Sequence, residues 1–345
     1  MHDDRLLLST GSTLLNLACS DSPHGGFRTG TIVLIGGDSD SGKTWLGLSC
    51  FAEACIDKRF AEHRLIYDNP EDGAGMDFAH YFGQAVADRI EQPCDDGPST
   101  TLDELYDNVT DALRGPPCIY LVDSLDPLDA ETDLDDFEER KGKRRRAKAA
   151  GKDADLSGSY GMQRPKINSA NLRKVKSALI KAPHSIVILL TQARDAVGKM
   201  GFGPKRTIAG GRALRFYSTI QMWSSVKETL TKPVRDEKVQ IGVLCKINLD
   251  KNHQTGKRRT VEFPIFHSYG IADTLSCIDY LVRHKHWPLA AGVINAKDFD
   301  LKLKRMPLAK KIETDGLVKQ LRSLVGDVWD EIEQACVVPL PRRYE

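Results

Sequence analysis

Short apolar runs alternate with amphipathic stretches along the first two thirds of the chain. The runs at 31–35, 64–67, 118–122 and 185–190 are rich in β-branched residues and predict buried strands. Helical patterns fall between them at 76–92, 101–115 and 167–182, and Thr101 with Glu104 forms a capping box. Strands that alternate with helices predict an α/β fold whose mostly parallel sheet is covered by helices on both faces.

Later in the chain, strands follow one another directly. Residues 220–226 predict a further strand after a short helix, and 239–250 and 258–266 alternate like two strands joined by a turn. This pattern predicts an antiparallel hairpin at the edge of the sheet. Residues after about Ser276 are helical in pattern and rich in lysine. We therefore predict a core over 1–275 and a small helical C-terminal domain over 276–345.

One segment of the predicted core, 129–155, shows no apolar periodicity. Six acids lie between Glu131 and Glu139, and eight cations lie between Arg140 and Lys152. Blocks of like charge are typical of solvated insertions, and a basic block is also a candidate contact for nucleic acid.

A glycine-bounded turn stands between the first apolar run and the helix that follows it. It reads Gly-x-x-x-x-Gly-Lys-Thr, and its predicted nucleotide-binding residues are Gly37, Asp38, Ser39, Asp40, Ser41, Gly42, Lys43, Thr44 and Trp45. In a P-loop, backbone N–H groups surround phosphate oxygens, the lysine reaches the β- and γ-phosphates, and the Thr hydroxyl binds Mg²⁺. The alternative is an ordinary Gly/Ser surface turn, but strand, turn and helix follow in the order that a P-loop requires. We therefore expect the chain to bind a nucleoside triphosphate with Mg²⁺.

Polar residues at the ends of the other apolar runs are the catalytic candidates. Asp123 ends one run and is expected to orient Mg²⁺ together with Thr44. Glu71 is the preferred acid for polarising the attacking water, with Asp68 and Asp72 as close competitors. Gln192 ends another run and is a candidate sensor of the γ-phosphate. The alternative is an ordinary amide side chain at the end of a strand, with no part in catalysis.

The amino-acid composition indicates the general class of the protein, but the net charge does not indicate its binding partners. The 345 residues are 41% hydrophobic and 28% charged, with a net charge of +1. No apolar run approaches the roughly 20 residues of a membrane span, so we predict a cytoplasmic protein without membrane contacts. The eight cysteines include no C-x-x-C pair, which favours buried free thiols over disulfides or zinc ligands.

These motifs resemble those of RecA-type recombinases from Leu8 to about Trp287. The resemblance is carried by GGDSDSGKT, IYDNPED, LVDSL, LLTQAR, GGRALRFYSTIQMW and KNHQTGKRRTVEF. It implies that Glu71 is the catalytic glutamate and that Phe78 stacks on adenine. It also implies that Lys251 and His253 reach the ATP of a neighbouring subunit, where the family has two lysines.

The same resemblance implies two DNA-binding loops, at 156–164 and 196–211. Their candidate contacts are Met162 and Arg164 in the first loop, and Lys199, Lys205, Arg206, Gly210, Gly211 and Arg212 at the second. Mobile backbone with a few cations suits contacts to single-strand phosphates. Without the resemblance, both segments read as ordinary charged surface loops.

Taken together, these features predict a DNA-dependent ATPase that binds single-stranded DNA and promotes pairing and strand exchange with homologous duplex, in DNA recombination and repair. Self-assembly into a filament or ring is implied. Only about seven residues precede the matching segment, where the family has a helix and strand that dock on the next subunit. Two alternatives therefore stay open: a ring-forming motor or helicase of the same fold, and an ATP-binding regulator that does not act on DNA.

Overall fold

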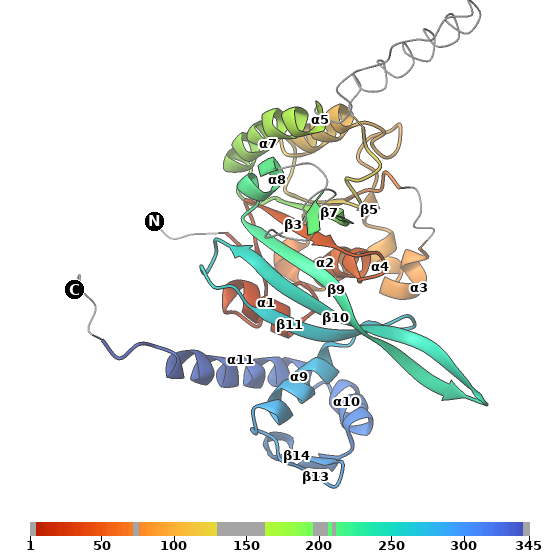
Figure 1. Cartoon of the computed structure of the whole chain (residues 1–345), viewed down its shortest axis with the longest axis vertical. Coiled ribbons are helices and arrows are strands. Elements are labelled where there is room, and N and C mark those ends of the chain that lie inside the picture. Colours follow the sequence, from red (N-terminus) through yellow and green to blue (C-terminus); the bar gives the residue numbers. More distant parts are fainter. Residues whose placement is uncertain (1–4, 72–75, 130–162, 196–205, 209–211, 341–345) are drawn as a thin grey trace, which may run out of the picture.

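The computed structural model describes residues 5–71, 76–129, 163–195, 206–208 and 212–340, and its centre is one large sheet (Figure 1). Its strand order is β12-β11-β10-β9-β3-β7-β6-β4-β5. Six neighbouring strands run parallel: β3 (Thr31–Gly37), β4 (Arg64–Asp68), β5 (Ile90–Glu91), β6 (Cys118–Val122), β7 (Ile186–Asp195) and β9 (Ile220–Val234).

Antiparallel strands complete one edge. They are β10 (Glu237–Asn252), β11 (Thr260–Phe266) and β12 (Gly270–Ile271), which pair in that order starting from β9. A short strand, β8 (Arg206–Ile208), pairs antiparallel with the end of β7. The predicted α/β class, with a mostly parallel sheet and an antiparallel edge, is confirmed.

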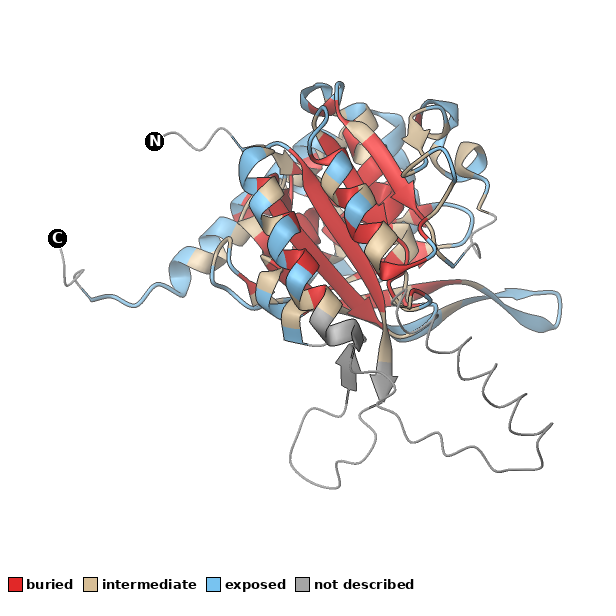
Figure 2. Ribbon diagram, turned by 90° about the horizontal axis from the view of Figure 1, so that it is seen from above, coloured by how far each residue is buried: buried red, intermediate tan, exposed pale blue. Residues whose placement is uncertain are grey.

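Helices cover both faces of the sheet because successive strand residues point to opposite sides. In β3, Val33 and Ile35 join the buried cluster that contains α1 (Thr13–Ser20) and α2 (Lys43–Ile56). Ile32 and Leu34 join the other cluster, with α5 (Leu102–Ala112), α7 (Gln163–Lys181) and α8 (Arg212–Tyr217). The central strands are accordingly buried along their length (Figure 2).

Short elements frame this core. β1 (Leu7–Leu8) pairs with β2 (Phe27–Arg28), and a 3-10 turn, η1 (Lys58–Phe60), follows α2. The helix predicted over 76–92 needs correction, because the structure has two short helices, α3 (Phe78–Phe82) and α4 (Gln84–Ala87), and then β5. Gly83 separates the two helices with a φ of 91°, which lies outside the helical region.

The β9–β10 hairpin extends well beyond the strands predicted at 220–226 and 239–250. Its paired residues reach Val234 and Glu237, and the distal half leaves the body of the molecule (Figures 1 and 2). Arg235 has a φ of 55° in the tight turn between the strands. Most of the distal residues are exposed and polar, so they lack the apolar alternation from which the sequence analysis predicts strands.

The C-terminal part holds α9 (Asp273–Arg283), α10 (Arg305–Thr314) and α11 (Val318–Ala335). It also holds η2 (Lys297–Phe299) and a small sheet of β13 (Leu289–Ala290), β14 (Val293–Ala296) and β15 (Leu301–Leu303). The prediction of a wholly helical segment is corrected by this sheet, whose strands are too short to show an alternating pattern.

The predicted division of the chain at 275/276 falls inside α9. Leu275, Cys277 and Ile278 of this helix belong to the same buried cluster as α1 and α2. The C-terminal elements therefore share apolar core with the sheet, and the two-domain division stays a prediction.

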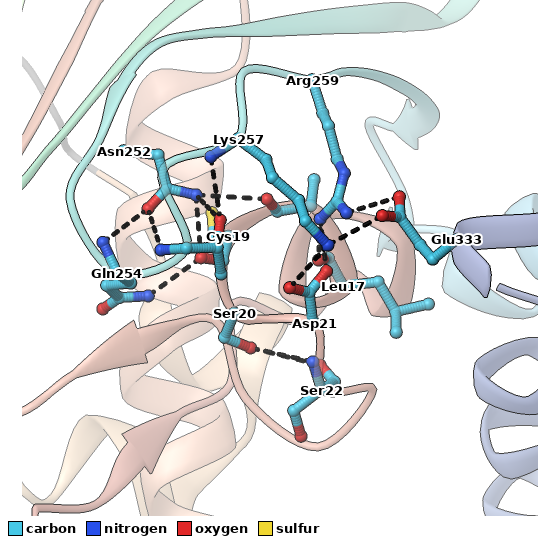
Figure 3. A network of polar contacts seen from close by, with 12 residues as sticks. Leu17, Cys19, Ser20, Asp21, Ser22, Asn252, Gln254, Lys257, Arg259 and Glu333 are labelled. Carbon is cyan, nitrogen blue, oxygen red and sulfur yellow. Dashed lines mark hydrogen bonds and ion pairs between the residues drawn. The ribbon is translucent and has the colours of Figure 1, made fainter. Parts of the chain in front are cut away.

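Ion pairs through Lys257 and Arg259 connect the end of α11 with the end of α1 (Figure 3). Arg259 Nη1 lies 2.6 Å from Asp21 Oδ1, and Arg259 Nη2 lies 2.5 Å from Glu333 Oε1. Lys257 Nζ bridges the same two carboxylates, at 3.2 Å from Asp21 and 2.7 Å from Glu333. The Arg259 guanidinium also lies 4.7 Å from the centre of the Trp329 ring, so this network combines charge with a cation–π contact.

We expect Glu333→Gln to lower the free energy of unfolding by about 0.5–1 kcal/mol at neutral pH. The hydrogen bond from Lys257 holds the pKa of Glu333 below its usual range. A carboxylate with a lowered folded-state pKa stabilises the fold at neutral pH and loses this effect as pH falls below about 4. Urea unfolding from about pH 7 down to about pH 3 should therefore show the variant and the wild type converging below about pH 4.

Asp315→Asn is the matched control, because Asp315 pairs with Lys311 within one exposed turn of the chain, outside the network. A difference between Glu333→Gln and wild type that stays constant with pH would contradict an ionic role for Glu333.

Candidate active site

The glycine-bounded turn connects β3 to α2, and two of its positions favour glycine. A Cβ on Gly37 would lie 2.4 Å from the Ser224 carbonyl oxygen, and one on Gly42 would lie 2.4 Å from Ile265 Cδ1. Gly42 also has a φ of 85°, which favours glycine at the N-terminus of α2. Lys43 begins the helix, and its Nζ donates to the carbonyl oxygens of Gly37 (3.2 Å) and Asp38 (2.6 Å).

A cavity of about 640 Å³ opens beside this turn, within the size range of small-molecule sites. It brings together Lys43, Thr44, Glu71 and Asp123, which the sequence analysis selected from separate motifs. The structure adds further lining residues that the sequence did not indicate: Asn69, Met76, Gln240, Val243, Ile265 and His267. Four of these come from the antiparallel edge, which only the tertiary fold brings to the turn.

Asp123 lies at the end of β6 and contacts both Thr44 and Tyr67. The Tyr67 hydroxyl donates to Asp123 Oδ2 at 3.1 Å. Burial raises the pKa of Asp123, although hydrogen bonds with Thr44 and Tyr67 oppose the shift. Burial likewise lowers the pKa of Lys43, against the opposing effect of Asp123. A hydroxyl and a carboxylate are oxygen ligands that suit Mg²⁺, with phosphate and water completing the shell.

Glu71 receives two hydrogen bonds from the neighbouring strand ends. Ser124 Oγ donates to Glu71 Oε1 at 2.6 Å, and Gln192 Nε2 donates to the same oxygen at 2.9 Å. The backbone N–H of Gln192 is held in turn by Asp126 Oδ2 at 2.5 Å. One carboxylate thus connects the segments that follow β4 and β6 with Gln192 of β7, at the rim of the cavity.

Asp68, the first alternative to Glu71 as the catalytic acid, forms hydrogen bonds away from the cavity. Its buried carboxylate accepts hydrogen bonds from Ser99 N (2.9 Å), Ser99 Oγ (2.6 Å) and Tyr120 Oη (2.8 Å). These contacts tie β4 to β6 and to the segment before α5, and Asp68 does not line the cavity. Asp72, the other competitor, lies outside the described residues.

The predicted adenine contact, Phe78, does not line the cavity either. Its ring meets Tyr67 edge to face, with centroids 5.6 Å apart. Among the described phenylalanine, tyrosine and tryptophan residues, Trp45 is the one that lines the cavity.

Lys251 lies near the end of β10 and His253 directly follows that strand, and neither residue lines the cavity. Lys251 Nζ donates to the carbonyl oxygens of Arg215 (2.8 Å), Phe216 (2.9 Å) and Ser218 (2.6 Å), at the end of α8. Burial lowers the pKa of Lys251. His253 is exposed.

The structure describes only 163–164 of the first predicted DNA loop and 206–208 of the second. Arg212 is exposed at the start of α8, while the backbone of Arg164 lies on α7 and that of Arg206 on β8. Met162, Lys199, Lys205, Gly210 and Gly211 lie outside the described residues, as does nearly all of the charged segment 129–155. These contacts stay predictions.

The parallel sheet, the turn ending in Lys43 and Thr44, and the acids that follow adjacent strands have the arrangement of a P-loop nucleotide-binding site. Comparison with known proteins narrows the class. Residues 146–272 match the family model for the RecA N-terminal domain. "Protein RecA" of Leptospira meyeri is 29% identical over 287 residues, which cover 81% of this chain and 63% of that protein.

Two further relatives carry the same name. The Nautilia profundicola protein is 28% identical, with 89% of this chain and 81% of that protein covered. The Campylobacter lari protein is 28% identical, with 85% and 78% covered. The chain is thus similar to RecA proteins over most of its length, and its match spans less than two thirds of the Leptospira meyeri protein. Within the described residues, no helix is long and apolar enough to cross a bilayer.

Proposed function

We propose that this chain hydrolyses ATP with Mg²⁺, binds single-stranded DNA, and promotes pairing and strand exchange with homologous duplex. One observation carries the catalytic part: Glu71, Asp123, Thr44 and Lys43 line one cavity at the P-loop. The DNA part rests on the relatedness to RecA proteins and on the loop residues that match the family's motifs.

Each residue has a distinct task in the proposed reaction. Lys43 exchanges its two backbone acceptors for phosphate oxygens, and the N-terminus of α2 favours the same negative charge. Thr44 and Asp123 hold Mg²⁺, which neutralises charge on the phosphates. Glu71 orients and polarises the attacking water, because its carboxylate stands at the rim of the cavity.

Gln192 connects this chemistry to the second predicted DNA loop. Its side chain binds Glu71, and its strand continues to Asp195, immediately before that loop. A change in the hydrogen bonding of Glu71 on nucleotide binding would therefore be felt at the start of the loop.

The proposal is tested by measuring ATP hydrolysis with and without single-stranded DNA, strand exchange between homologous substrates, and assembly by electron microscopy with an ATP analogue. We expect DNA-stimulated hydrolysis, strand exchange and filaments. Rings that unwind duplex would indicate the motor instead, and ATP binding without any DNA effect would indicate the regulator.

Lys251→Ala is expected to depress DNA-stimulated hydrolysis while leaving ATP binding intact, if its charge acts on a neighbour's nucleotide. The variant also removes a cation from the carbonyl end of α8, so the free energy of unfolding should fall by about 1 kcal/mol.

Mixing Lys251→Ala with Lys43→Ala protein separates the two effects, because one composite site with both lysines can then form. Some activity should return in the mixture. If both proteins are folded and co-assemble but no activity returns, Lys251 acts only within its own subunit.

A further inference from the structure

Trp45 lies at the wall of the candidate active site, opposite Gly270. It follows Thr44 directly in the first turn of α2 and lines the P-loop cavity. Its indole has room because Gly270 lacks a side chain: a Cβ there would lie 3.3 Å from indole Cζ3. Gly270 also has a φ of 86°, so both backbone conformation and space favour glycine opposite this ring.

Two aromatic rings hold the indole in position. Tyr81 meets it nearly perpendicular, with centroids 5.1 Å apart, and Phe82 is tilted by 50° at 5.3 Å. Neither ring stacks parallel on the indole. Trp45 is partly exposed and lines the cavity, so part of the indole is accessible from it.

Beside Trp45, the cavity has the composition of a base-binding pocket. Met76, Val243 and Ile265 give it apolar walls, and Asn69, Gln240 and His267 place amide and imidazole groups at its edge. Small-molecule sites combine an apolar lining with a few polar groups in this way. The phosphate-binding residues Lys43 and Thr44 are the immediate chain neighbours of Trp45.

Phe78, in contrast, already packs against other side chains of the protein. It packs against the main buried cluster and meets Tyr67 edge to face. To stack on a base, it would have to leave both contacts.

We propose that Trp45 is the stacking platform for the purine base of the bound nucleotide, in place of Phe78. The inference rests on the proposed function, because it concerns the same nucleotide. Base–aromatic stacking contributes about 1–3 kcal/mol, which corresponds to about a 5- to 150-fold change in the dissociation constant.

The test compares two probes on the full chain with Mg²⁺: ATP, and inorganic tripolyphosphate, which has the phosphates without the base. Trp45→Ala should weaken ATP binding by about 5- to 150-fold and leave tripolyphosphate binding within about twofold. Retained tripolyphosphate binding also shows that the variant is folded. Trp45→Phe keeps an aromatic face, so it should recover most of the loss. Stacking of the base on Trp45 should change the tryptophan fluorescence when ATP binds, and Trp45→Phe should remove that change.

Phe78→Leu is the matched control and should leave the affinity for ATP within about twofold. The opposite pattern, with ATP binding lost in Phe78→Leu and unchanged in Trp45→Ala, would overturn the assignment. If wild-type protein binds neither probe, the proposed function itself fails. Lys43→Ala, which should lose both probes, distinguishes loss of phosphate binding from loss of base binding.

Discussion

Glu71→Gln is expected to bind ATP normally and to hydrolyse it about 10²- to 10⁴-fold more slowly. Glutamine keeps the size of the side chain and an oxygen that can accept from Ser124 and Gln192, which lie 2.6 and 2.9 Å from the carboxylate. What it loses is the negative charge that polarises water. Binding is therefore retained while turnover falls, which is the signature of an interaction made in the transition state.

The measurement is single-turnover hydrolysis beside equilibrium ATP binding. Asp68→Asn serves as the control, because Asp68 binds Ser99 and Tyr120 away from the cavity; its cost should appear in stability more than in turnover. Normal hydrolysis by Glu71→Gln would show that the catalytic acid is misassigned, and Asp72 would be tested next.

The second large effect is expected in stability, from Asp273→Ala. Asp273 accepts from Thr13 N (2.7 Å), Thr13 Oγ1 (2.8 Å) and Arg322 Nε (3.0 Å), and so ties α9 to α1 and α11. Removing it leaves the mostly buried Arg322 with Glu53, at 3.6 Å, as its remaining ion-pair partner. Breaking one side of a buried ion pair costs about 3 kcal/mol.

Another aspartate of α9 provides the control. Asp279 pairs with Arg305 of α10, but both side chains are more exposed, at 38% and 42%. Asp279→Ala should cost no more than about 1 kcal/mol. Urea unfolding of both variants gives the comparison, and equal losses would contradict the assigned difference in burial.

The parts of the fold that the sequence predicted are those set by local patterns. Parallel strands are buried on both faces, so they appear as apolar runs, and the P-loop is fixed by consecutive residues. The sequence did not predict the break at Gly83 or the small sheet of β13–β15, because these segments are too short to show a helical or alternating pattern of apolar residues. The sequence also did not predict the distal part of the β9–β10 hairpin. Its mostly polar, exposed strands are stabilised by pairing with each other, and this pairing leaves no pattern of apolar residues in either strand.

For the site, the sequence indicated which strand ends carry polar groups but not how each group is used. Asp68 and Glu71 are close neighbours in the chain, yet only Glu71 lines the cavity, because Ser99 and Tyr120 bind Asp68. Gln240 and His267 reach the P-loop from strands about 200 residues later, through the strand order of the sheet. The use of a side chain thus depends on contacts between distant segments.

The buried face of α11 has a practical consequence for handling the protein. Leu321 and Val325 are fully buried in the same cluster as the sheet, whereas Val337 and Leu340, just beyond the helix, are more than two thirds exposed. A shortened chain that ends before α11 would uncover the apolar core and invite aggregation. Affinity tags and fluorescent fusions are better attached after the helix, where they displace no packed side chain.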